Sequence, residues 1–153
     1  MPDEDFYIKN FPRVPFWEHL GIEIAEVKPG YARLVMDTHE NLTNPYGYTH
    51  GGVLSTLADS AAAVALVHGL DLEDKRLMTV ELKINYLNPV SGGVIEAKAR
   101  ALREGRIVPV DVDIYNENVL VAKSIATYII LTPRRINLQF TVKIQKLPGT
   151  RAR

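Results

Sequence analysis

The chain has 153 residues, 46% of them hydrophobic, which fits one globular domain with a sizeable core. The 18 basic and 18 acidic residues balance, so net charge gives no reason to expect a nucleic acid or an acidic surface as partner. The absence of cysteine excludes disulfides, thiolate catalysis and cysteine-ligated metals. The acidic start (MPDED), and the lack of an uncharged apolar run long enough to cross a bilayer, predict a cytoplasmic protein without a membrane segment.

Charge is unevenly distributed along the chain. From Pro133 onward there are six basic residues and no acidic one, which leaves 12 basic against 18 acidic residues in the rest. We expect a single domain over residues 1–132, with 1–14 as a loose arm, and a basic C-terminal extension over 133–153. Apolar and polar residues alternate within that extension, which fits an additional strand, and a solvated extension is the alternative.

The N-terminal part of the chain is predicted to form a short helix and a β-hairpin. Residues 15–21 begin with proline and end with glycine, as short helices often do, and their apolar side chains share one face that can cover a core. Residues 22–28 and 31–38 form the two strands. The turn dipeptide Pro29-Gly30 joins them.

One long helix is predicted between Thr49, which fits an N-cap, and Gly69, which fits a C-terminal stop. Apolar residues cover nearly its whole circumference, as in buried helices, and its alanines allow other elements to approach closely. A single polar stripe interrupts them at a spacing of three or four residues, made of Gly52, Ser55, Thr56, Asp59 and Ala63.

Four strands follow this helix. The cleanest alternation places Val80, Leu82, Ile84 and Tyr86 on one face and Thr79, Glu81, Lys83 and Asn85 on the other. Residues 95–101, 108–114 and 119–131 form the others, and the last is long and apolar enough to be internal. Consecutive hairpins predict an antiparallel meander. The predicted class is therefore α+β, with an antiparallel sheet wrapped around one long central helix.

Asp59 is the unusual residue of this helix, because a buried carboxylate is costly unless it is paired or hydrogen-bonded. It is either a structural aspartate bonded to a neighbouring loop or a carboxylate held for chemistry. The sequence His50-Gly51-Gly52 favours chemistry, because the first N–H groups of a helix lack intrahelical partners and glycines let a ligand approach. Such an end can polarise a carbonyl and stabilise an oxyanion. A tight helix entry without a ligand is the alternative.

The two ends of this segment cannot serve one reaction within a single chain. Gly52 and Asp59 are about 10 Å apart along the axis at ~1.5 Å per residue. Reacting groups must lie within about 3–3.5 Å of each other, or one water further. Two antiparallel copies related by a two-fold axis bring the glycine end of each to the aspartate of the other. The sequence therefore predicts a homodimer with two shared sites.

The motif N-x-x-G-x-x-H-G-G beginning at Asn44, followed by L-x-D ending at Asp59, resembles the hotdog-fold acyl-CoA thioesterases. The PaaI-like subfamily (phenylacetate-pathway, thioesterase superfamily member 2-like) is the most similar. The resemblance continues through residues 79–89 and Gly105-Arg106. It implies a hotdog fold, a homodimer or homotetramer, an acyl- or aryl-acetyl-CoA substrate, and neither cofactor nor metal.

The resemblance also assigns catalytic roles. Asp59 of the opposite subunit activates water or attacks as the nucleophile, and the sequence does not decide between the two. The N–H of Gly51 polarises the thioester carbonyl, and His50 shapes the loop. Asn44 holds the carbonyl or the water, unless it only starts the Asn-Pro turn. Thr79 orients the water, unless it is merely an outward strand residue.

Three further positions are expected to contact the substrate. Gly52 is the alternative carbonyl donor, and Thr56 lies one helical turn beyond it. Arg106 would meet a coenzyme A phosphate or else be solvated. Two other functions stay open. One is a non-catalytic, acyl-CoA-binding regulatory protein, and the other is an acyl-thioester hydratase or dehydratase, which would need His50 as its base.

Overall fold

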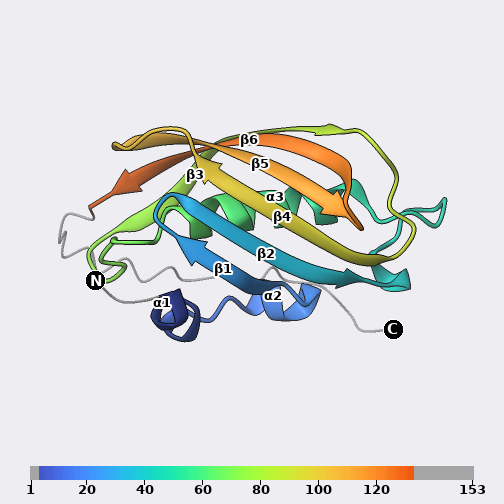
Figure 1. The fold of residues 1–153 in the computed structure, drawn as a ribbon, viewed down its shortest axis with the longest axis horizontal. Helices are drawn as coiled ribbons and strands as arrows, with labels where there is room; N and C mark the ends of the chain where they lie inside the picture. The colour runs from blue at the N-terminus through green and yellow to red at the C-terminus, as the bar shows by residue number, and fades with distance from the viewer. Residues whose placement is uncertain (1–3, 133–153) are drawn as a thin grey trace, which may run out of the picture.

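The computed structural model describes residues 4–132 and has the predicted class, an antiparallel sheet curved around one long helix (Figure 1). The elements in chain order are α1 (Glu4–Asn10), α2 (Pro15–Leu20), β1 (Glu23–Lys28), β2 (Tyr31–Thr38), η1 (Glu40–Leu42), α3 (Gly51–Ala65), β3 (Arg76–Tyr86), β4 (Gly93–Ala101), β5 (Ile107–Asn116) and β6 (Val119–Leu131).

The six strands lie in the order β1-β2-β4-β5-β6-β3, and every neighbouring pair is antiparallel. The prediction of a four-strand meander after the helix is wrong for β3. Strand β4 already has β2 on one edge and β5 on the other, so β3 pairs instead with β6 at the far edge of the sheet. The internal position predicted for β6 is confirmed.

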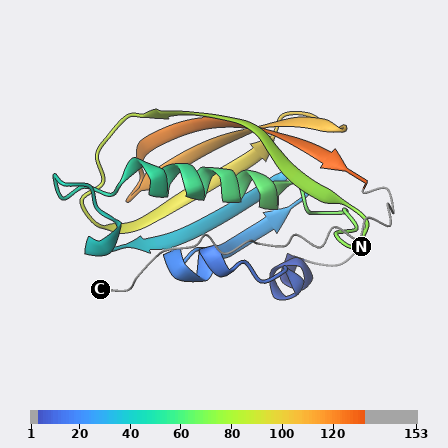
Figure 2. The same cartoon turned by 180° about the vertical axis from the view of Figure 1, so that it is seen from behind.

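Helix α3 packs along the concave face of the sheet (Figure 2). Its buried side chains include Leu57, Ala58, Ala61, Ala62 and Val64, each fully buried. The small alanines let β2, β4 and β5 approach the helix closely. The helix is not buried all round, however, because the stripe predicted as polar keeps partial exposure to solvent.

Both predicted ends of this helix need correction. The N-cap is His50, whose Nδ1 accepts a hydrogen bond from the N–H of Gly52, while Thr49 is buried and its N–H donates to the Val90 carbonyl. The helix ends at Ala65, and turns occupy the residues up to Gly69. Gly69 does have the left-handed backbone expected of a stop, with φ of 79°.

Removing the side chain of Leu57 is expected to destabilise the fold strongly. Leu57 is fully buried at the centre of α3, so Leu57→Ala leaves a cavity and costs about 2–5 kcal/mol. Chemical denaturation measures the loss of unfolding free energy. The matched control is Leu102→Ala, because Leu102 is 56% exposed; its cost is expected to stay within about 0.5 kcal/mol. Equal costs for the two variants would contradict this description of the core.

The N-terminal arm is more ordered than predicted. Residues 4–10 form helix α1, whose Tyr7 hydroxyl accepts a hydrogen bond from the N–H of Gly69 at 3.1 Å. The ring of Phe11 stacks on Trp17 of α2 at a centroid distance of 5.3 Å. These aromatic contacts explain the order, because they fasten the arm to the turn after α3 and to the short helix that covers the core.

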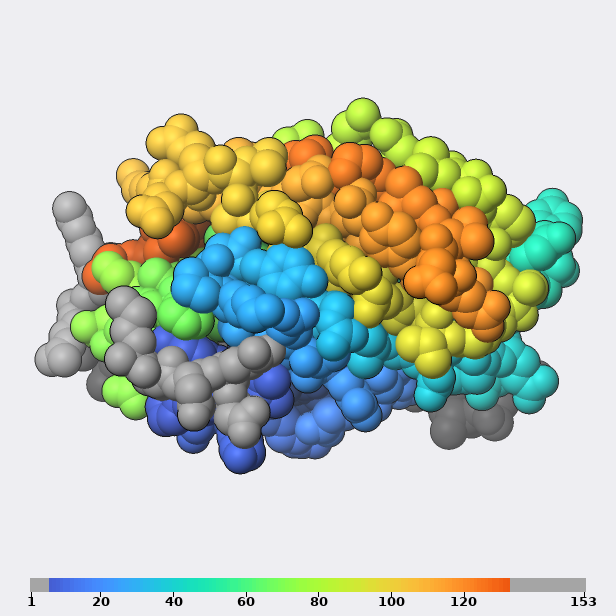
Figure 3. All heavy atoms as spheres, in the orientation of Figure 1, coloured from blue at the N-terminus to red at the C-terminus, as the bar shows by residue number. Residues whose placement is uncertain are grey.

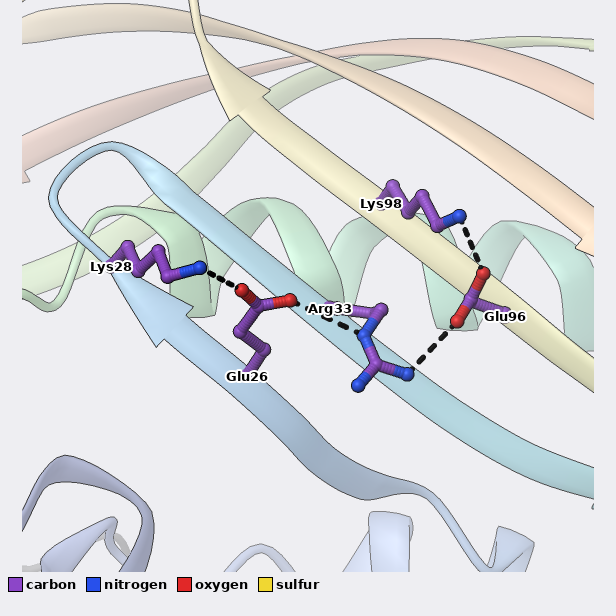
Figure 4. Close-up of polar contacts among 5 residues, drawn as sticks. All are labelled: Glu26, Lys28, Arg33, Glu96 and Lys98. Carbon is purple, nitrogen blue, oxygen red and sulfur yellow. Dashed lines mark hydrogen bonds and ion pairs between the residues drawn. The ribbon is translucent and has the colours of Figure 1, made fainter. Parts of the chain in front are cut away.

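The convex face of the sheet, which turns away from α3 and faces the viewer in Figure 3, carries a row of charged side chains (Figure 4). Arg33 on β2 bridges Glu26 of β1, at 3.4 Å, and Glu96 of β4, at 2.9 Å. Lys28 and Lys98 complete the row. The hydrogen bond from Lys28, with a further one from Arg33, lowers the pKa of Glu26. These pairs join three neighbouring strands on the side of the sheet opposite the helix.

The predicted extension over residues 133–153 lies outside the described residues. Within residues 4–132, no helix is both long enough and apolar enough to span a bilayer.

Candidate active site

Asp59 lies in the middle of α3, half-buried, and its carboxylate meets hydroxyl groups from two strands. The Thr79 hydroxyl of β3 donates to Oδ1 at 3.0 Å and lies 3.3 Å from Oδ2. The Tyr128 hydroxyl of β6 lies 2.7 Å from Oδ1. The carboxylate is therefore hydrogen-bonded, chiefly through Oδ1, by side chains of β3 and β6. It is not the loop-bonded aspartate that the structural alternative describes.

Thr79 reaches Asp59 because of a β-bulge. The register between β3 and β6 shifts between Thr79 and Glu81, so Val80 is the extra residue. Thr79 pairs with Tyr128, and Leu82 pairs with the buried Ala126. Thr79 and Leu82 thus share the helix side of the sheet. Strict alternation placed Thr79 with Glu81 on the outer face, and that prediction is wrong because one inserted residue reverses the orientation.

Tyr128 is a residue of this site that the sequence analysis missed. It is 3% exposed, and its hydroxyl also lies 2.9 Å from the backbone carbonyl of Asp59. Burial raises the pKa of the Tyr128 phenol well above its ordinary value, and the hydrogen bond to Asp59 adds to the rise. A signal was present in the sequence: Tyr128 is the only hydroxyl-bearing aromatic side chain in the long apolar strand. A buried tyrosine hydroxyl usually has a partner.

The N-terminus of α3 forms the second part of the candidate site. His50 Nδ1 accepts from the Gly52 N–H at 2.9 Å, so Gly52 is engaged in capping and Gly51 is the better placed donor for a ligand. Among residues 4–132, the Gly51 N–H has no hydrogen-bond partner. The Tyr86 hydroxyl donates to the Gly51 carbonyl at 3.0 Å. A Cβ added to Gly51 would lie 3.1 Å from the Tyr86 ring, so the glycine permits this close packing.

Asn44 organises the loop before the helix. Its side-chain oxygen accepts from the backbone N–H groups of Tyr46, at 2.9 Å, and Tyr48, at 3.2 Å. Its own N–H donates to the Tyr48 carbonyl at 2.7 Å. This is the geometry of an Asx turn, and it leaves the side-chain amide nitrogen as the group that can meet a ligand.

Two hollows flank this helix end. One, of about 420 Å³, is lined by residues that include Asn44, Gly51 and Tyr86. The other, of about 330 Å³, is lined by residues that include Gly52, Thr56 and the α2 residues Phe16 and Leu20. The Thr56 hydroxyl donates to the Gly52 carbonyl at 2.8 Å.

Arg106 does not belong to this helix end. It is exposed, its carbonyl accepts from the N–H of Ile130, and it lines a separate hollow together with Lys75. Ile130 is two residues beyond Tyr128 on β6, so the backbone of Arg106 lies beside the end of β6 that carries Tyr128.

Within one chain the two parts of the site stay apart. Gly51 and Asp59 are about 12 Å apart along the axis of a regular helix at ~1.5 Å per residue. Across residues 4–132, no group of three or more His, Cys, Asp or Glu side chains is placed to hold a metal ion.

Comparisons with known proteins bear on this geometry. Residues 46–123 match the family model described as the thioesterase superfamily. A protein of Saccharolobus solfataricus, whose name describes it as an esterase without giving a substrate, is 39% identical over 113 residues, which cover 72% of this chain and 74% of that one. A 1,4-dihydroxy-2-naphthoyl-CoA hydrolase of Listeria monocytogenes is 33% identical, covering 58% of this chain and 72% of its own.

A solved structure agrees with the sequence comparisons. The crystal structure of a thioesterase from Haemophilus influenzae superposes with a TM-score of 0.75 at 27% identity, covering 86% of this chain and 92% of that one. The family match spans both the glycine end of α3 and Asp59. The chain belongs to the thioesterase superfamily and is a thioester hydrolase with the hotdog fold.

Proposed function

We propose that this protein hydrolyses acyl-CoA thioesters to a free acid and coenzyme A, with Asp59 as the catalytic carboxylate. The observation that carries the proposal is the carboxylate itself, which lies half-buried on the stripe of α3 that the sheet leaves partly open, with its Oδ1 held by two hydroxyl groups. Burying a carboxylate in a helix rich in alanine is costly, and among the described residues this one keeps Oδ2 with a single long contact, at 3.3 Å from Thr79, which fits a carboxylate held for chemistry.

The catalytic unit in this proposal is a homodimer. Strand β3 has a neighbour on one edge alone among the described strands, and its Met78, Val80 and Tyr86 are each more than half exposed. A long edge strand with exposed apolar side chains favours pairing with another chain. The partly exposed stripe of α3 offers small side chains for an antiparallel helix of the partner. Such pairing brings the Gly51 end of one copy to Asp59 of the other.

The proposed reaction uses both parts of the site, the N-terminus of α3 in one copy and Asp59 in the other. The Gly51 N–H, at the positive end of the helix dipole, binds the thioester oxygen and stabilises the oxyanion that develops on it. Asp59 of the partner takes a proton from water, which attacks the carbonyl carbon, or attacks that carbon itself and forms an anhydride that water hydrolyses. The carbon–sulfur bond breaks and coenzyme A leaves as a thiolate that takes up a proton.

The substrate has three candidate contacts beyond the reacting groups. The hollow beside Gly52 and Thr56 is lined by apolar side chains of α2 and suits the acyl group. Arg106 and Lys75 line one hollow and together offer positive charge to the phosphates of coenzyme A. Thr79 donates its proton to Asp59, so it can accept a hydrogen bond from the attacking water.

Membership of the PaaI-like subfamily, and with it the class of acyl group, is also part of the proposal. A phenylacetic-acid-degradation-related thioesterase from Ralstonia eutropha superposes with a TM-score of 0.74 at 25% identity, covering 82% of this chain and 97% of that one. A medium/long-chain acyl-CoA thioesterase of Salmonella typhimurium is 29% identical over 133 residues, covering 76% of this chain and 86% of its own. Both aryl-acetyl and fatty acyl groups therefore belong in a substrate panel.

The experiment is thiol release from a panel of short-chain, long-chain and aryl-acetyl-CoA thioesters. We expect hydrolysis of at least one of them, with kcat/KM between about 10⁴ and 10⁸ M⁻¹s⁻¹ for a good substrate. Tight binding of acyl-CoA without thiol release would favour the regulatory, non-catalytic function. Loss of the absorbance of an enoyl-CoA without thiol release would favour a hydratase with His50 as base.

A further inference from the structure

The two oxygen atoms of the Asp59 carboxylate have different surroundings. Oδ1 is within 3.0 Å of the Thr79 hydroxyl and 2.7 Å of the Tyr128 hydroxyl. Among residues 4–132, Oδ2 has only the longer contact with Thr79, at 3.3 Å. A carboxylate can accept about four hydrogen bonds, so Oδ2 keeps most of its capacity for a further partner.

Of the two side chains that contact the Asp59 carboxylate, Tyr128 is the more rigidly held. Its side chain is almost fully buried, and β6 is an internal strand with β5 on one side and β3 on the other. A tyrosine phenol is protonated at neutral pH, and burial raises the pKa of Tyr128 further, so its hydroxyl donates a hydrogen bond to the carboxylate. Thr79, in contrast, is exposed and lies at the bulge of an edge strand. The rigid contact therefore comes from Tyr128.

We infer that Tyr128 is a positioning residue for the reaction, holding Oδ1 of Asp59 so that Oδ2 is the oxygen that reacts. This inference rests on the proposed function, because it concerns which atom of Asp59 takes the proton from water or attacks the thioester. Hydrogen bonds from a rigid side chain fix both the rotation of a carboxylate and its distance from the reacting carbon.

The first test is Tyr128→Phe, which keeps the ring in the core and removes the hydroxyl. We expect kcat to fall about 10- to 100-fold because the carboxylate loses its orientation, while KM stays within about twofold. The matched control is Tyr115→Phe. Tyr115 lies on β5 with its ring over Lys98 of the convex face, away from Asp59, so this control is expected to keep the wild-type kcat. A variant that folds with unchanged kcat would overturn the inference.

A merely structural role for the hydroxyl must give a different result. It would lower the melting temperature and the amount of folded enzyme, but kcat per folded dimer would stay at the wild-type value. Thermal unfolding and active-site titration of Tyr128→Phe separate these outcomes.

The second test does not depend on activity. In protein labelled with ¹³C at the tyrosine ζ carbon, the Tyr128 resonance is expected to shift in Asp59→Asn while that of Tyr115 does not, because only Tyr128 loses a charged acceptor. An unchanged Tyr128 resonance would overturn the inference. If the wild type cleaves no thioester, the proposed function fails. The resonance then still decides whether the hydrogen bond exists.

Discussion

Replacing Asp59 with asparagine is expected to lower kcat/KM about 10³-fold for every acyl-CoA that the wild type cleaves, within the ~10²–10⁴ range of general base catalysis. The amide is nearly the same size, and its oxygen can still accept the hydrogen bonds of Thr79 and Tyr128. It can neither take a proton from water nor attack a carbonyl. The fold and the assembly are therefore expected to persist, as measured by circular dichroism and size-exclusion chromatography.

A matched control separates the role of this carboxylate from a general effect of lost charge. Asp113 lies on β5 and forms an ion pair with Lys123 on the convex face of the sheet. The Lys123 Nζ lies 2.7 Å from the Asp113 Oδ1. Asp113→Asn removes the same charge and is expected to keep thiol release within about twofold of wild type, because this partly buried pair lies on the face of the sheet opposite Asp59. If Asp59→Asn retained comparable activity, Asp59 would have a structural role and the carboxylate mechanism would be wrong.

Mixing two inactive variants is expected to restore activity. Asp59→Ala lacks the carboxylate, and Gly51→Val places a branched side chain against the Tyr86 ring, where even a Cβ would lie 3.1 Å away. In a mixed dimer, the intact Gly51 of the first variant faces the intact Asp59 of the second. Random exchange of equal amounts should give about one quarter of the wild-type activity, because half of the dimers are mixed and each has one complete site.

The control for this experiment is a mixture of Asp59→Ala with Asp59→Asn. Every site of that mixture lacks the carboxylate, so it is expected to stay inactive after the same exchange procedure. Subunit exchange is followed by native mass spectrometry of differently tagged chains. If the Gly51→Val mixture forms mixed dimers and releases no thiol, the two parts of the site do not meet across the dimer, and the shared-site proposal fails.

The sequence predicted the helix and the faces of most strands because these depend on local periodicity. The alternation of buried Val108, Val110 and Val112 was visible in the sequence, and the structure confirms it. The cluster of alanines in α3 likewise predicted close packing of the helix on other elements, which the contacts with β2 and β4 confirm.

The helix start shows why an end is harder to predict than an element. Both Thr49 and His50 can accept a hydrogen bond from a helix N–H, and thereby act as an N-cap. The backbone of Thr49 is committed to pairing, since its N–H donates to Val90 from another part of the chain. The cap therefore falls on His50, and only the long-range contact decides this.

In the candidate site, too, the features within one continuous segment were predictable and those that depend on long-range contacts were not. The sequence by itself determined the helix that carries Asp59, the glycines at its N-terminus and the thioesterase motif that contains both, because these lie in one continuous segment. Tertiary structure alone decided that β3 lies beside β6, that the bulge at Val80 turns Thr79 toward the carboxylate, and that Tyr128 donates to the same oxygen. Strand pairing depends on which edges other strands have already occupied, and one inserted residue reverses the face of a side chain.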